Sequence, residues 1–201
     1  MNDYSDDVFG FDDEHTPNMK TVDLYQRFAP ANISWSEWVP ITRIEPNIYL
    51  GGVHTPSDDP VDGRHMDGRM APHCFLETYG IRAVVSLTDL PVKWNVHPDI
   101  RHLHYPVLDY PTTQLKPYFD EAASFIEECL KEGRGIFVHC HMGISRSTTM
   151  LIAYYMKCRG MTLQHAIQRI QSSRSFSLPN IGFIKQLVLY EKELASARME
   201  N

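Results

Sequence analysis

The sequence predicts an α/β domain in which helices flank a central, largely parallel sheet. Short apolar runs with the length of buried strands alternate with longer segments in which apolar residues recur every three or four positions, as on one face of a helix. Glycine and proline separate these segments. With 201 residues, of which 43% are hydrophobic, the chain can bury one such core.

The first forty residues predict an acidic, partly disordered N-terminal extension (residues 1–40). Residues 1–20 contain six acidic side chains and few apolar ones, a composition that buries too little surface to fold alone. An acidic partner-binding tail is the alternative interpretation. Aromatic residues return between Thr21 and Pro40, so we expect this part to lie against the domain.

The predicted domain spans residues 41–197 and carries a loop insertion at residues 53–72. Ile41 to Leu50 is expected to form two short strands around a turn at Glu45-Pro46-Asn47. Val53 to Pro72 is rich in proline, glycine and aspartate and is expected to be a loop, which is long for a compact domain. It is either a tolerated surface insertion or a substrate-recognition loop, since long loops often carry function.

Helices and strands alternate through the middle of the chain. His73 to Tyr79 is expected to form a short helix, and the apolar runs Arg82 to Leu87 and Ile100 to Val107 are expected to form buried strands. Tyr118 to Glu132 places its apolar residues on one helical face. Gly133 then ends this helix, because glycine readily adopts the left-handed conformation found at helix C-termini.

The C-terminal third predicts one more strand and three helices. The strand ends at Cys140, and the segment from Ser147 to Cys158 is apolar nearly all round, which indicates a buried helix. Thr162 can cap the next helix. Pro179-Asn180 is expected to begin the last one.

The segment from Ile136 to Ser147 carries the chemistry. A strand, a tight loop and a helix N-terminus direct backbone N–H groups and the positive end of the helix dipole to one place, which suits a phosphate. Cys140 begins the loop, and Arg146 at its end can bond a phosphate with two parallel N–H donors. A helix N-terminus and an arginine both favour the thiolate, so Cys140 is expected to act as a nucleophile toward phosphorus.

The spacing from Cys140 to Arg146 is C-x-x-x-x-x-R, within the longer pattern His139-Cys140-x-x-Gly143-x-Ser145-Arg146-Ser147. This pattern resembles the signature of the dual-specificity phosphatases, a family of the cysteine-based protein tyrosine phosphatase superfamily, and the chain is similar to the atypical single-domain type. The resemblance runs from about Ile41 to Leu194 and implies a protein tyrosine phosphatase-like fold. It also rests on Ile48–Gly51, Tyr105–Asp109, Ile152–Met156 and Pro179–Leu187.

Three catalytic residues are expected. Cys140 is the nucleophile, and Arg146 binds the phosphate and stabilises its charge in the transition state. The resemblance assigns Asp109 as general acid and later as general base for water; it is expected on a loop after a strand that neighbours the central one. The structural alternatives are a buried inert thiol, a surface salt-bridge arginine and a turn-forming aspartate.

Backbone N–H groups of the loop are expected to complete the phosphate site, while its side chains point away, so that the turn matters more than residue identity. Ser147 is expected to hydrogen-bond the sulfur, to cap the helix, or both. His139 is expected to support the loop, and Asn180 either caps the last helix or lies near the loop. The substrate-binding loop residues are His141, Met142, Gly143, Ile144, Ser145 and Arg146.

No cofactor and no metal are expected. His102 and His104 share one strand face, and His139 and His141 have the same spacing. A metal site is conceivable, but no carboxylate or cysteine pattern completes it, and strand alternation explains the spacing better.

The cysteines and the charge restrict the environment and the partners. Four widely spaced cysteines without a C-x-x-C pair indicate a reducing compartment, so we expect a cytoplasmic protein with nuclear access left open. A formal charge of −6 disfavours a nucleic-acid partner, and no apolar run is long enough for a membrane span. The sequence carries no signal for the oligomeric state. The cysteines are Cys74, Cys129, Cys140 and Cys158.

The predicted function is a metal-independent phosphatase that hydrolyses phosphotyrosine and phosphoserine or phosphothreonine in phosphoprotein partners through a phosphocysteine. The alternatives are the same chemistry on a lipid, RNA or glucan phosphate, and a silent phosphopeptide-binding module. Phosphoinositide-directed relatives tend to carry lysines in the loop, and RNA-directed relatives tend to end it in Asn-Arg-Thr; neither feature occurs here. A silent module has no need of Cys140, Arg146 and Asp109 together.

Overall fold

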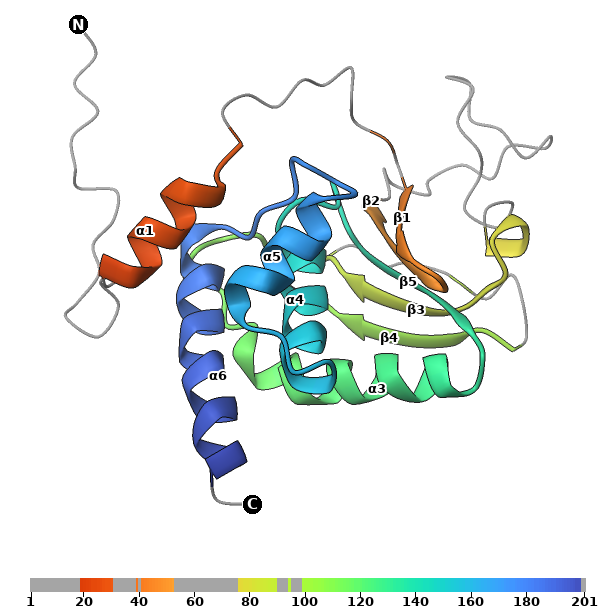
Figure 1. Cartoon of the computed structure of the whole chain (residues 1–201). Helices are drawn as coiled ribbons and strands as arrows, with labels where there is room; N and C mark the ends of the chain where they lie inside the picture. Colours follow the sequence, from red (N-terminus) through yellow and green to blue (C-terminus); the bar gives the residue numbers. More distant parts are fainter. Residues whose placement is uncertain are drawn as a thin grey trace, which may run out of the picture.

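The computed structural model describes residues 19–30, 39, 41–52, 76–89, 94 and 99–199, which build a five-stranded sheet packed against helices (Figure 1). β1 and β2 pair antiparallel, whereas β2 with β5, β5 with β3 and β3 with β4 pair parallel. The predicted α/β class with a largely parallel sheet is therefore confirmed. In spatial order the strands are β1 (Ile41–Glu45), β2 (Ile48–Gly52), β5 (Gly135–Cys140), β3 (Ile81–Leu87) and β4 (Arg101–Tyr105).

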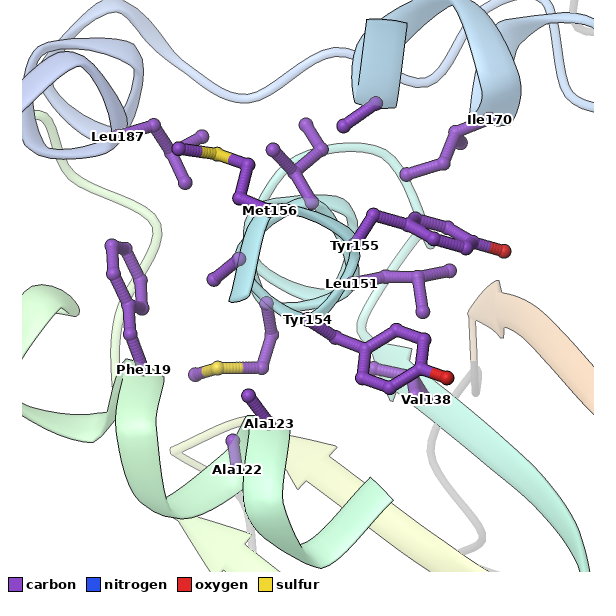
Figure 2. Packing of buried hydrophobic residues seen from close by; sticks show 14 of the residues in the cluster. Phe119, Ala122, Ala123, Val138, Leu151, Tyr154, Tyr155, Met156, Ile170 and Leu187 are labelled. Carbon is purple, nitrogen blue, oxygen red and sulfur yellow. The ribbon is translucent and has the colours of Figure 1, made fainter. Parts of the chain in front are cut away.

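One helix, α4, forms the centre of the helical layer. It packs against β5 and against α3, α5 and α6, and all its residues from Arg146 through Met156 are buried. Figure 2 shows apolar side chains of these neighbours surrounding it. The prediction of a buried helix is confirmed. The helices are α3 (Phe119–Lys131), α4 (Arg146–Cys158), α5 (Leu163–Gln171) and α6 (Ile181–Met199).

The three central strands, β2, β5 and β3, are buried on both faces, as is usual for parallel strands. Successive side chains of a strand point to opposite faces. Val85 and Val138 therefore join the main core under the helices, whereas Val84 and Phe137 join a smaller cluster on the other face. Trp94 covers that second cluster and is 2% exposed.

The chain leaves the sheet earlier than predicted at the end of β4. The expected strand reached Val107, but β4 ends at Tyr105. Pro106 has no N–H to donate to a neighbouring strand, and the Val107 N–H turns back to the Tyr105 carbonyl at 2.9 Å. The segment that carries Asp109 is consequently a loop that starts at the edge of the sheet.

The helix α1 (Met19–Phe28) packs against α6, and its Leu24 side chain is buried. The expectation that this part lies against the domain is confirmed for residues 21–28. Residues 1–18 and 53–75 lie outside the described residues, so the division into extension, domain and insertion stays a prediction. Within the described ranges, no helix has both the length and the apolar character that a membrane span requires.

Candidate active site

The loop between β5 and α4 packs tightly onto the end of β2. Gly143 has a φ of 68°, and a Cβ there would lie 2.3 Å from the Gly51 carbonyl carbon. A Cβ at Gly52 would lie 2.5 Å from the His141 carbonyl oxygen. Glycines on both sides of this contact allow the backbones to approach, and Gly143 also meets the requirement for a left-handed conformation.

Two donors converge on the sulfur of Cys140, which is 1% exposed. The Gly143 N–H donates to Sγ at 3.3 Å, and the Ser147 hydroxyl donates at 3.2 Å. Hydrogen bonds to a charged form favour that form, so this arrangement stabilises a thiolate. The alternative that Ser147 caps the helix is wrong: Ser145 occupies the N-cap position, and Ser147 lies inside the first turn.

The guanidinium of Arg146 is buried rather than part of a surface salt bridge. Its Nη1 donates to the Val107 carbonyl at 3.0 Å, and its Nε lies 3.5 Å from Asp109 Oδ2. Asp89 Oδ1 lies 3.8 Å from Nη1. Among the described residues Nε makes no hydrogen bond, although it is buried. An unsatisfied buried donor is unusual, and here it is available to a phosphate oxygen.

Asp109 lies beside the loop, but not by the route that we expected. Its strand, β4, does not neighbour the central strand, because β3 lies between β4 and β5. The segment after β4 instead crosses to the loop, where Asp109 Oδ1 accepts from Ser145 Oγ at 2.7 Å and from Asn180 Nδ2 at 2.8 Å. The side chain remains 34% exposed, so a substrate can reach it.

Both alternatives for Asn180, the cap of the last helix and a place near the loop, are confirmed. Its Oδ1 accepts from the Phe183 N–H at 3.0 Å, as a cap of α6, while its Nδ2 binds Asp109. Its backbone N–H also donates to Ser145 Oγ at 3.0 Å. We expected the identity of the loop side chains to matter less than the turn; Ser145 is an exception, because its hydroxyl links Asp109 to the start of α6.

His139 is fully buried behind the loop. Its Nε2 lies 2.6 Å from Ser86 Oγ, and its Nδ1 lies 3.3 Å from the Cys140 carbonyl oxygen. Burial lowers the pKa of His139 to about 3, so the ring is neutral at physiological pH. Ser86 also receives a hydrogen bond from Trp94 Nε1 at 3.0 Å and lies 2.8 Å from His102 Nε2. Ser86 was not predicted from the sequence, although a serine within an apolar strand was a usable signal.

Two residues of α6, Gln186 and Gly182, hold the Asp109 loop and were not predicted as site residues. Gln186 Oε1 accepts from the backbone N–H groups of Leu115 and Lys116 at 2.7 and 2.9 Å, and its Nε2 donates to the Thr113 carbonyl at 2.8 Å. A Cβ at Gly182 would lie 1.9 Å from the Pro111 carbonyl oxygen. α6 thus contacts the segment after Asp109 at Pro111 and again between Thr113 and Lys116.

The histidine pairs have protein partners. The rings of His102 and His104 stack with their centroids 5.8 Å apart, and His104 Nε2 lies 2.8 Å from the Thr88 carbonyl oxygen. No group of three or more metal-ligating side chains occurs in the part of the chain that the structure describes.

In sequence this chain is similar to dual specificity phosphatases. The family model "Dual specificity phosphatase, catalytic domain" matches residues 67–193. Dual specificity protein phosphatase 1 of Arabidopsis thaliana is 37% identical over 152 residues, 75% of this chain and 69% of the relative. Dual specificity protein phosphatase 1B of the same species is 46% identical over 88 residues, 44% of this chain and 53% of the relative. Part of each relative therefore lies outside the match.

The solved structures agree with the sequence comparisons. Human DUSP28 superimposes with a TM-score of 0.66 at 25% identity, over 83% of this chain and 99% of that chain. DUSP15 superimposes with a TM-score of 0.61 at 28% identity, over 80% and 96%. On these matches, and with the family model covering more than half of its length, the chain belongs to the dual-specificity phosphatase family of cysteine-based hydrolases.

Proposed function

We propose that this protein hydrolyses phosphotyrosine and phosphoserine or phosphothreonine in phosphoproteins through a phosphocysteine intermediate. The observation that carries the proposal is the convergence on one loop of a sulfur with two hydrogen-bond donors, a buried arginine with an unsatisfied N–H, and a half-exposed carboxylate. These groups supply a nucleophile, a phosphate-binding cation and a proton donor. The reaction needs no metal-bound water, because the first nucleophile is a side chain.

In the first half-reaction the Cys140 thiolate attacks phosphorus, the S–P bond forms and the bond from phosphorus to the substrate oxygen breaks. Asp109 in its acid form gives its proton to that oxygen. Because Oδ1 is held by Ser145 and Asn180, Oδ2 is the oxygen left for proton transfer. Arg146 and the loop N–H groups stabilise the equatorial phosphoryl oxygens.

In the second half-reaction water attacks the phosphocysteine. A proton of this water passes to the Asp109 carboxylate, and the S–P bond breaks. Inorganic phosphate is released, and the Cys140 thiolate is regenerated. The Ser147 hydroxyl and the Gly143 N–H donate to the sulfur and so stabilise it as the leaving group.

Protein phosphate is the favoured substrate class. PTPMT1, solved in complex with PI(5)P, has a TM-score of 0.64 at 17% identity, and this likeness concerns the fold alone. The loop positions His141, Met142 and Ile144 provide no lysine for additional phosphates of a lipid headgroup. A silent phosphopeptide reader is the second candidate class, and the simultaneous presence of Cys140, Arg146 and Asp109 disfavours it.

The test is hydrolysis of para-nitrophenyl phosphate in the presence of a chelator. We expect activity in the native chain and its loss in Cys140→Ser. Turnover that survives Cys140→Ser would exclude the mechanism, and a native chain that binds phosphopeptide without turnover would be the silent module. Cys140→Ser can then serve as a trap in cytosolic and nuclear extracts, where retained phosphoproteins identify substrates.

A further inference from the structure

A second arginine, Arg174, lies behind the phosphate loop. It belongs to the segment that joins α5 to α6, which Figure 1 shows as a loop between these two helices. The residue is 1% exposed. Its guanidinium stacks on Phe176, with Cζ 4.5 Å from the ring centroid. Neither the C-x-x-x-x-x-R spacing nor the proposed reaction steps involve this residue.

The Arg174 guanidinium holds two consecutive peptide units of the loop by their oxygens. Nη2 donates to the Met142 carbonyl at 3.1 Å, and Nε donates to the Gly143 carbonyl at 2.9 Å. Ser177 Oγ adds a second donor to the Gly143 carbonyl at 3.1 Å. The remaining nitrogen, Nη1, donates to the Val39 carbonyl at 2.9 Å and to Thr42 Oγ1 at 2.8 Å, which ties the loop to β1.

These contacts act on the sulfur through the peptide bond. The carbonyl of Met142 and the N–H of Gly143 belong to one planar trans peptide unit, so they point in opposite directions. Arg174 holds the oxygen end, and the N–H end donates to Cys140 Sγ at 3.3 Å. Hydrogen bonds in such a chain polarise one another, so the guanidinium strengthens the donor that faces the sulfur. The next unit, Gly143 to Ile144, is held in the same way.

The charge of Arg174 has no carboxylate partner among the described residues. Its acceptors there are three carbonyls and one hydroxyl. Burial lowers the pKa of Arg174 to about 10, and the opposing influence is the charge of Cys140. A buried cation without a counter-ion is costly, and an anion at Cys140 or in the phosphate site offsets that cost.

We propose that Arg174 is a positioning residue for the phosphatase reaction, which holds the Met142 and Gly143 peptide units by their oxygens and so stabilises the Cys140 thiolate and the phosphate cradle. This inference rests on the proposed function, because it assigns a second arginine to the same site. The proposal predicts that the charge of Arg174 and the fork geometry of its guanidinium have separable effects on the Cys140 thiolate and on the phosphate cradle. A lysine keeps the charge, but its single ammonium cannot reproduce the fork that reaches both carbonyls.

The test uses iodoacetamide alkylation of Cys140 in the full chain, with Cys140→Ser giving the background from the other cysteines. In Arg174→Met we expect alkylation at about pH 6 to slow by about tenfold, while at about pH 9, where an unassisted thiol also ionises, it changes by less than about twofold. A wild-type rate at the lower pH, or an equal loss at both, would overturn the proposal. The equal loss is what a merely structural role produces.

A second readout is protection of Cys140 by sodium tungstate, which reports the phosphate cradle. Arg174→Lys should retain near wild-type alkylation at the lower pH, yet need about tenfold more tungstate for half-protection. If Arg174→Met fails to fold, Arg174→Lys still tests the proposal, because wild-type tungstate protection in Arg174→Lys would contradict the role of the guanidinium fork. Arg169→Gln is the matched control, because Arg169 also donates to a β1 carbonyl, at Ile44, but not to the loop. It should behave as wild type.

Neither readout requires turnover, so the two proposals fail separately. Turnover in Cys140→Ser would reject the phosphocysteine mechanism whatever Arg174 does. If alkylation and tungstate protection do not change in the Arg174 variants, the positioning role is rejected and the phosphocysteine mechanism is unaffected.

Discussion

The close contact between Gly182 and Pro111 predicts that a side chain at position 182 displaces the Asp109 loop and lowers activity. Gly182 lies in the first turn of α6, and an ideal Cβ there would lie 1.9 Å from the Pro111 carbonyl oxygen. Ordinary contact begins at 3.4 Å, so in Gly182→Ala the loop has to retreat by about 1.5 Å. Pro111 is two residues from Asp109, which follows this movement.

The size of the effect follows from the distances at Asp109. Its hydrogen bonds of 2.7 Å to Ser145 and 2.8 Å to Asn180 do not survive a retreat of that size. Displacing a reacting group by about 1 Å costs about 10²-fold in rate. We therefore expect Gly182→Ala to lower kcat for phenyl phosphate by about 10²-fold. The loss with para-nitrophenyl phosphate should be much smaller, because its leaving group departs without a proton.

The assay compares kcat for the two esters, with thermal melting and tungstate protection of Cys140 measured in parallel. Tungstate protection should stay at the wild-type value, because the phosphate loop loses only a side-chain contact of Ser145, while its backbone N–H groups keep their places. Gly133→Ala is the matched control: Gly133 has a φ of 74°, and nothing lies within 4 Å of its would-be Cβ. It should lose about 1–2 kcal/mol of stability without changing either kcat. Equal losses on both esters in Gly182→Ala, or wild-type kcat on phenyl phosphate, would refute the reasoning.

Three further predictions concern single side chains. Ser147→Ala should slow turnover about tenfold to hundredfold and let phosphocysteine accumulate, because a hydrogen bond to a charged sulfur contributes about 1.5–3 kcal/mol. Rapid mixing with para-nitrophenyl phosphate should then show a burst of para-nitrophenol, and the absence of a burst counts against this role of Ser147. Asp109→Asn should lower kcat for phenyl phosphate by about 10²–10⁴-fold but affect para-nitrophenyl phosphate less, and equal losses would remove its role as acid. Burial lowers the pKa of His139 in the folded chain to about 3, whereas the ordinary value, expected in the unfolded chain, is 6.5. When the pH falls from 6.5 toward 3, only the unfolded chain therefore takes up a proton at this residue. Stability should then drop by up to about 1.4 kcal/mol per pH unit, as urea unfolding can measure, and His139→Gln, but not the exposed-site control His165→Gln, should flatten this dependence.

The sequence alone determined most of the local elements and the arrangement of the loop. Apolar periodicity located the five strands and the starts of α3, α4, α5 and α6 to within one or two residues, because the spacing of apolar side chains reflects which face of an element is buried. It did not predict the helix α1. The segment from Cys140 to Arg146 is equally local: a strand, a turn with Gly143 and a helix N-terminus create the donor-lined site from neighbours in the chain.

Only the tertiary structure decided how distant segments complete that site. β3 lies between β4 and β5, so Asp109 reaches the loop across the sheet edge, and no local pattern encodes strand order. Ser145 acquires its role from Asp109 and Asn180, 36 and 35 residues away. Arg174 contacts Gly143 from 31 residues away, and Gln186 contacts Leu115 from 71. Such contacts depend on how α5 and α6 pack around α4, because propensity and periodicity specify which face of an element is buried, but not which polar group it meets there.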